Sequence, residues 1–216
     1  MLARTEKVVF QGAFGDIDCA LEIPAGTPRG WALVLHPHPL HGGARDNKIV
    51  TTIARACVQA GLLALRPNFR GVGASAGQFD AAVGETADMA GLVQQFADAY
   101  PEAAAGKWVL AGFSFGTSVA AQLYSLQAEQ QRTVPDALML VGSAVDRFRF
   151  RDVSIPADTL LIHGEQDEVV PLSEAMDFAR QRVLPMVVIP EAGHFFHGKL
   201  PMLKLLIQQR LAATGL

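Results

Sequence analysis

Two short stretches of the chain have the pattern Gly-x-Ser-x-Gly, the local signature of an activated serine in many hydrolases. They read GASAG at residues 73–77 and GFSFG at residues 112–116, so the candidate nucleophiles are Ser75 and Ser114. A serine of this kind is lifted above a sheet by a very short turn that leads from a strand straight into a helix. The question is which stretch lies between a strand and a helix.

GFSFG meets this requirement, because the apolar run WVLA leads directly into it and TSVAAQLYSLQ follows with helical character. Ser114 would then lie at a helix N-terminus, where free backbone N–H groups favour developing negative charge. GASAG lies in a glycine-rich loop, several residues from the strand before it and the helix after it. We therefore interpret Ser114 as the nucleophile and Ser75 as a loop serine.

A serine hydroxyl needs an imidazole to take its proton and a carboxylate to hold that imidazole. A histidine follows the predicted strand 186–189 in GHFFHG, where His194 is closest to the strand end and His197 is expected at the surface. Candidate acids follow the predicted strand 159–162 in HGEQDEVVP and the predicted strand 137–141. They are Glu165, Asp167 and Glu168, with Asp146 as a further alternative.

Short apolar runs alternate with amphipathic segments along the chain, which is typical of a mostly parallel sheet covered by helices on both faces. A hairpin is expected first, and about eight strands in all form one α/β domain over residues 1–216. The predicted strands are 7–14, 16–24, 31–35, 62–65, 108–111, 137–141, 159–162 and 186–189. The predicted helices are 46–60, capped by Asp46 or Asn47, and 83–100, 114–127, 172–181 and 200–212.

Over nearly its whole length the chain resembles the α/β-hydrolase superfamily, through the GFSFG turn and its ordered partners. It also resembles a compact bacterial subgroup of predicted hydrolases, through LHPHPLHGGARDNK, RPNFRGVGASAG, GFSFG, and HGEQDEVVP followed by GHFFHG. The resemblance implies the α/β-hydrolase fold and a catalytic triad of Ser114, Asp167 and His194 in one hydrogen-bonded line. It makes GASAG part of a loop at the pocket rim.

The same resemblance implies an oxyanion hole that uses the backbone N–H of Phe115. A second N–H would come from the loop HPHPLHGG after the strand 31–35. Pro37 and Pro39 have no N–H to give, which leaves His38 or Leu40, and we favour His38.

Only about 17 residues separate the predicted strands 137–141 and 159–162, where this fold often inserts a lid, so we expect no cap domain and an open cleft. The residues expected to line it are Phe113, Phe115, Leu40, Phe195 and Phe196. Arg70 is expected either to approach the substrate or to form an ion pair with Glu85 or Asp88. Such a cleft favours a carboxylesterase for small or solvent-accessible esters. One alternative is another enzyme with the same triad: a peptidase, thioesterase, lactonase or acyltransferase. The other is a non-catalytic binding protein on this scaffold.

Composition argues against several other classes. The net charge is −3 and there is no basic run, so we expect no nucleic-acid partner. The N-terminus lacks the apolar core of a signal peptide and no run reaches membrane-spanning length, so a cytoplasmic protein with no membrane partner is expected. Cys19 and Cys57 fall on apolar faces and are expected to be buried thiols. The three histidines of residues 36–41 lie between prolines with few carboxylates near them, so neither a metal nor another cofactor is expected.

Overall fold

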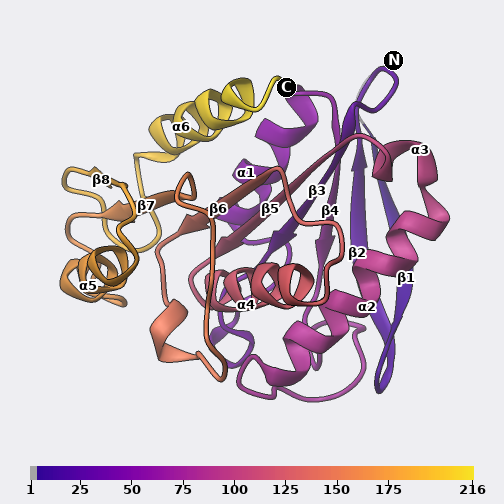
Figure 1. Ribbon diagram of the computed structural model, residues 1–216, viewed down its shortest axis with the longest axis horizontal. Helices are drawn as coiled ribbons and strands as arrows, with labels where there is room; N and C mark the ends of the chain where they lie inside the picture. Colours follow the sequence, from indigo (N-terminus) through magenta and orange to yellow (C-terminus); the bar gives the residue numbers. More distant parts are fainter. Residues whose placement is uncertain (1–3) are drawn as a thin grey trace.

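The computed structural model describes residues 4–216, and these residues form eight strands in one mixed sheet (Figure 1). The order of the strands across the sheet is β1-β2-β4-β3-β5-β6-β7-β8. The antiparallel pairs are β1 with β2 and β2 with β4, and every other neighbouring pair is parallel. The strands are β1 (Arg4–Gly12), β2 (Gly15–Ile23), β3 (Gly30–Leu35), β4 (Leu62–Pro67), β5 (Lys107–Phe113), β6 (Ala137–Val141), β7 (Leu160–Gly164) and β8 (Met186–Ile189).

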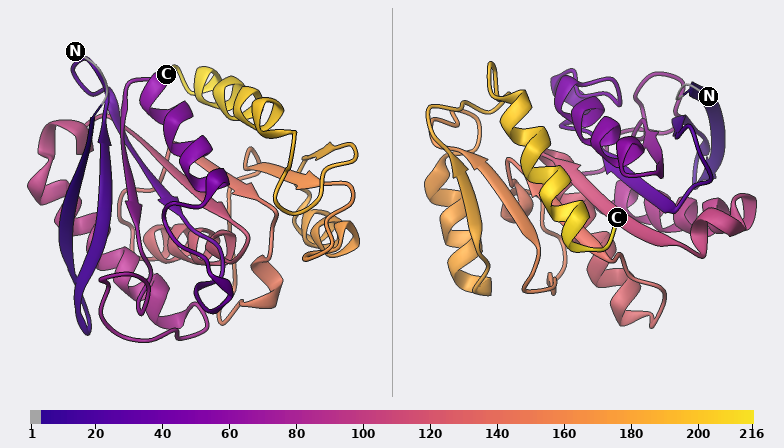
Figure 2. Two further views of the ribbon diagram at one scale, coloured as in Figure 1. Left: turned by 180° about the vertical axis from the view of Figure 1, so that it is seen from behind. Right: turned by 90° about the horizontal axis from the view of Figure 1, so that it is seen from above.

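Helices cover both faces of the sheet (Figure 2). They are α1 (Lys48–Gln59), α2 (Val83–Ala99), α3 (Pro101–Ala104), α4 (Phe115–Glu129), α5 (Leu172–Arg182) and α6 (Leu200–Ala213). α1 and α6 pack together on one face, and α2 and α4 lie on the other. The sequence of β3 is apolar throughout because both faces of the strand are buried. Trp31 and Leu33 join the core under α2 and α4, while Ala32 and Val34 join the core under α1 and α6.

The predicted fold class is confirmed, including the antiparallel start and the eight strands. Asn47, one of the two predicted caps, accepts a hydrogen bond from the N–H of Ile49 at 2.9 Å and so begins α1. The short helix α3 and the 3-10 turns Pro39–His41 and Val145–Arg147 were not predicted. Within residues 4–216, the connection from β6 to β7 contains only the second of these turns and no cap domain. No helix in this part of the chain is both long and apolar enough to cross a membrane.

Both cysteines are buried, as their positions on apolar faces predict. Burial is the main influence on both thiols and raises the pKa of each to about 12. Neither Cys19 nor Cys57 is therefore a thiolate at neutral pH.

The two loops that carry the subgroup resemblance, after β3 and after β4, lie against each other. The Phe69 N–H donates to His36 Nε2 at 2.9 Å, and the Arg45 N–H donates to Asn68 Oδ1 at 3.0 Å. Ser75 is buried in the second loop, where its hydroxyl accepts from the Asp18 N–H and donates to the Asn68 carbonyl. The serine of GASAG is thus placed as a structural bridge.

His36 is fully buried at the junction of these loops. Its Nε2 accepts from Phe69, so its Nδ1 carries the proton and donates to the Pro37 carbonyl at 2.6 Å. Burial is the main influence on this ring and lowers the pKa of His36 from 6.5 to about 4. The folded protein therefore holds His36 neutral.

We predict that this histidine makes the protein sensitive to mild acid. His36 binds a proton near pH 6.5 in the unfolded chain but only near pH 4 in the folded chain. The contribution of His36 to the free energy of unfolding is therefore fully present above pH 6.5 and is lost as the pH falls below it. Between pH 7 and pH 5 the loss attributable to His36 is about 2 kcal/mol. Urea unfolding at both pH values measures it. A His36→Gln variant keeps an acceptor for Phe69 and should lack this part of the pH dependence; an equal loss in both proteins contradicts the prediction.

Candidate active site

Ser114 is the single residue between β5 and α4, so the chain turns from strand to helix in one step. Its backbone has φ 53° and ψ −121°, a region that L-residues rarely adopt and that is found where surrounding structure enforces it. The Ser114 N–H donates to the Val141 carbonyl at 2.9 Å, and the Thr117 hydroxyl donates to the Ser114 carbonyl at 2.6 Å. These bonds fix the turn to β6 and to the first turn of α4.

The glycines of GFSFG are required by close approach of backbone. A Cβ at Gly112 would lie 2.2 Å from the Gly116 carbonyl oxygen, and a Cβ at Gly116 would lie 2.5 Å from the Leu35 carbonyl oxygen. Both distances are far shorter than a van der Waals contact, and both partners are backbone atoms that have little freedom to move. GFSFG is therefore the tight strand-to-helix turn that the sequence predicts.

His194 lies on the loop after β8, and Asp167 lies on the loop after β7. Both side chains are buried, and His194 Nδ1 is 2.7 Å from Asp167 Oδ2. The ring of His194 packs on the ring of Phe113, with the centroids 5.0 Å apart. A proton on Nδ1 shared with the carboxylate leaves Nε2 of the neutral ring as an acceptor.

The carboxylate of Asp167 is held from both sides. Its Oδ1 accepts from the N–H groups of Val169 at 2.9 Å and Val170 at 2.7 Å, while its Oδ2 faces His194. Burial works to raise the pKa of Asp167, but the hydrogen bonds from His194 and Val170 outweigh it and hold that pKa below its usual value. Asp167 is therefore ionised at neutral pH.

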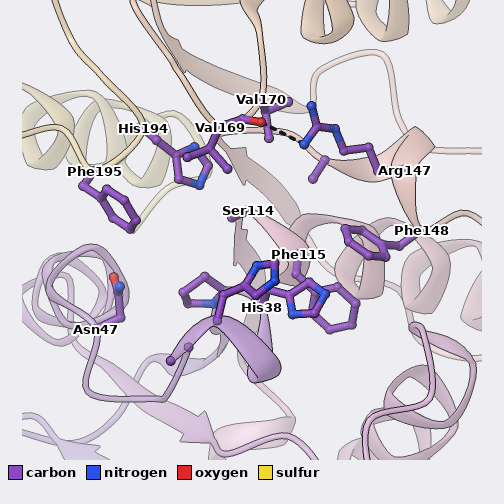
Figure 3. Close-up of a pocket in the computed structure, with 15 residues that line it drawn as sticks. His38, Asn47, Ser114, Phe115, Arg147, Phe148, Val169, Val170, His194 and Phe195 are labelled. Carbon is purple, nitrogen blue, oxygen red and sulfur yellow. Dashed lines mark hydrogen bonds between the residues drawn. The ribbon is translucent and has the colours of Figure 1, made fainter.

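Ser114 and His194 line one pocket of about 270 Å³ (Figure 3). Figure 3 shows Ser114 near its centre, with His194 and Phe195 to one side and Phe148 to the other. The described residues include no hydrogen bond between the Ser114 hydroxyl and His194, so only the His194–Asp167 half of the expected line is formed. The full lining is Pro37, His38, His41, Gly42, Gly43, Asn47, Ser114, Phe115, Ala144, Arg147, Phe148, Val169, Val170, His194 and Phe195.

The two candidates for the second oxyanion donor have different surroundings. The Leu40 N–H already donates to His38 Nδ1 at 3.2 Å, and its side chain is exposed and outside the pocket lining, which corrects that expectation. His38 lies in the lining, and no hydrogen bond within residues 4–216 uses its backbone N–H. Burial and then the neighbouring His41 lower the pKa of the His38 side chain.

Several expected substrate contacts are also corrected. Phe113 and Phe196 are fully buried core residues rather than pocket walls, whereas Phe195 is 42% exposed and lines the pocket. Arg70 is buried outside this pocket, where its Nε and Nη2 each lie 2.8 Å from Asp88 Oδ2, so the ion-pair alternative is the one formed.

The alternative acids and base do not take part in the buried pair. Asp146 is exposed and pairs with Arg149 and Arg182. Glu165 and Glu168 are exposed and accept only backbone N–H groups, from Glu191 and His194 respectively. His197 is exposed on the surface, as expected.

Part of the pocket wall was not predicted. Arg147 and Phe148 follow β6, and Arg147 Nη1 donates to the Val169 carbonyl at 2.8 Å while its Nε bonds Glu174 at 2.7 Å. The hydrogen bonds of Glu174 raise the pKa of Arg147. The usable signal was their position in the loop that follows the predicted strand 137–141, at the same sheet edge as Ser114.

The protein is a hydrolase with the α/β-hydrolase fold, and comparison with known proteins gives its family. A family model described as "Serine hydrolase (FSH1)" matches residues 78–205, and the chain belongs to this family. This stretch contains Ser114, Asp167 and His194.

Two solved structures are similar over nearly their whole length. One is XC6422 from Xanthomonas campestris, described as an α/β serine hydrolase without a lid, with 32% identity, a TM-score of 0.86, and coverage of 97% of this chain and 94% of that chain. The other is an α/β serine hydrolase homologue from Coxiella burnetii, with 35% identity, a TM-score of 0.83, and coverage of 94% and 96%. The uncharacterized protein RP471 of Rickettsia prowazekii is 29% identical over 201 residues, covering 89% of this chain and 83% of that protein.

We predict that Gly116→Ala destabilises the protein by about 3 kcal/mol or more, because the added methyl group would meet the backbone carbonyl of Leu35. Gly91→Ala is the matched control, since Gly91 lies exposed within α2 and a Cβ there meets no backbone. That control should gain up to about 1 kcal/mol from helix propensity. Thermal and urea unfolding compare the two variants, and equal stability would show that the turn tolerates a side chain.

Proposed function

We propose that the protein is a carboxylic ester hydrolase in which Ser114 is the nucleophile, His194 the general base and Asp167 the residue that orients His194. The observation that carries the proposal is the enforced backbone turn at Ser114, with its hydroxyl in the same pocket as the buried His194–Asp167 pair. Hydrogen bonds between nucleophile and base are often long before substrate binds and tighten in the Michaelis complex.

The reaction proceeds through an acyl-enzyme. His194 Nε2 takes the proton of Ser114 as Oγ attacks the ester carbonyl, and the imidazolium is stabilised by the ionised Asp167. The imidazolium then protonates the leaving alkoxide. A water molecule, deprotonated by His194, attacks the acyl-enzyme and releases the acid together with free Ser114. These steps need no cofactor.

The oxyanion is stabilised by two backbone N–H groups in this proposal. Phe115 is the first residue of α4, so its N–H has no partner within the helix and lies at the positive end of the helix dipole. The N–H of His38 is the second donor. The 3-10 turn that follows His38 is closed by hydrogen bonds from the N–H groups of His41 and Gly43 to the His38 carbonyl, which hold this part of the loop in place.

The size of the pocket favours a small molecule as substrate. A volume of about 270 Å³ lies at the lower end of ordinary ligand pockets. Exposed apolar side chains of Phe195 and Val169 lie at its edge, and the described chain has no cap domain that would enclose a long acyl chain. Short acyl groups therefore fit best.

We predict that a fluorophosphonate probe labels Ser114 and that Ser114→Ala abolishes labelling while leaving the fold intact. Ser75→Ala, in the other Gly-x-Ser-x-Gly stretch, GASAG, is the matched control. It should keep the labelling but lose about 1–3 kcal/mol of stability, because two buried hydrogen bonds of its hydroxyl disappear. Mass spectrometry locates the label, and labelling at Ser75, or none in folded wild-type protein, contradicts the proposal. The second outcome favours a non-catalytic binding protein.

We predict that kcat/KM for p-nitrophenyl acetate and butyrate exceeds that for the decanoate by at least about tenfold, the factor expected when a few methylene groups lack a pocket. A thioester, a lactone and an aminoacyl amide in the same assay test the thioesterase, lactonase and peptidase alternatives. Ser114→Ala measures the background for each substrate. A preference for the decanoate would exclude the proposed acyl class, and a preference for the amide would favour a peptidase.

A further inference from the structure

A second buried histidine lies against the carboxylate of Asp167. His163 is at the C-terminal end of β7 and is 1% exposed. Its Nε2 lies 2.8 Å from the Val170 carbonyl oxygen and 3.3 Å from Asp167 Oδ2. His194 approaches the same Oδ2 at 2.7 Å, so two imidazoles meet at one carboxylate oxygen.

The hydrogen bonds fix the protonation of His163. A carbonyl oxygen can only accept, so Nε2 carries the ring proton and donates it to the Val170 carbonyl. Nδ1 is buried with no partner among the described residues, and a second proton there would be an unpaired buried donor. Burial is the main influence on the ring and lowers the pKa of His163, which keeps it neutral.

Charged groups on the neighbouring elements are paired with each other. Glu174 of α5 and Arg147, after β6, face the Asp167–His163 cluster, and their side chains form a salt bridge at 2.7 Å. The remaining ionisable neighbours are Asp167 and His194 themselves. Apart from His194, the neutral Nε2–H of His163 is therefore the side-chain N–H group that lies against Asp167 among these groups, 3.3 Å from its Oδ2.

We propose that His163 is a positioning residue for the catalytic base: its Nε2–H donates to the Val170 carbonyl and lies 3.3 Å from Asp167 Oδ2, so it holds in place the Val170 peptide whose N–H binds the carboxylate that orients His194. This inference rests on the proposed function. With His163, the carboxylate has four N–H neighbours, from Val169, Val170, His194 and His163. The Val170 peptide is held at both ends, since its N–H binds Asp167 and its carbonyl binds His163.

Removal of this donor changes the reaction in two ways. The carboxylate charge on Oδ2 is less neutralised, so it stabilises the imidazolium of the base more strongly and the base becomes active only at higher pH. The carboxylate is also less rigidly oriented, so kcat falls. KM changes little because His163 is not part of the pocket lining.

The test compares the pH profiles of kcat/KM for wild type, His163→Leu and His163→Gln, with p-nitrophenyl acetate as substrate. In His163→Leu the apparent pKa of the acid limb should rise by about 0.5–1 unit and kcat at pH 7 should fall about 3–10-fold, with KM within about twofold of wild type. His163→Gln keeps an N–H donor at the corresponding position and should restore the wild-type acid limb. If His163→Leu does not fold, His163→Met, which also lacks a donor, takes its place.

Two results would overturn the inference. One is a wild-type acid limb in the variant without a donor, and the other is an equal shift in the leucine and glutamine variants, which would mean that only the shape of the ring matters. Fluorophosphonate labelling of wild type at Ser114 is measured first. If wild type is not labelled at Ser114, the proposed function itself is wrong. If it is labelled but the acid limb of the pH profile is the same with and without a donor at residue 163, only this inference is wrong.

Discussion

The close approach of three backbone segments around Ser114 is the constraint on which the site depends. Gly116 lies against the Leu35 carbonyl at the end of β3, and Gly112 lies against Gly116, so β3, β5 and α4 meet without intervening side chains. This contact holds Ser114 in a strained conformation that an isolated turn would relax. The strain is sustained because β5 is central in the sheet and buried on both faces, where the surrounding core resists local rearrangement.

The proposed acid and base depend on a different kind of support. Asp167 and His194 are carried by loops after neighbouring strands, and loops alone would not fix their geometry to the precision that proton transfer needs. Hydrogen bonds supply it, because Asp167 collects backbone N–H groups of its own loop and His194 packs on Phe113. A buried carboxylate with these donors stays ionised, so it acts as a fixed anion beside the imidazole.

The order of the elements and the Ser114 turn were readable from the sequence because both follow from local rules. Apolar runs buried on both faces predict strands, and two glycines flanking a serine between a strand and a helix predict the elbow. Side-chain direction was less readable. Phe113 and Phe196 flank the site in sequence, but both point into the core while Phe195 lines the pocket. Which way each ring points depends on tertiary packing that short-range spacing does not encode.

Two features of the site depend on hydrogen bonds that residue spacing does not show. Arg147 reaches the pocket wall through a bond to the Val169 carbonyl on another loop, and the N–H of Leu40 is taken up locally by the His38 side chain. In the sequence of the loop HPHPLHGG, every residue except the prolines has a backbone N–H that could serve as a donor. The structure adds that a donor is useful only when no nearer acceptor has taken it. The preference for His38 over Leu40 therefore depends on competition for hydrogen bonds, which only the folded loop displays.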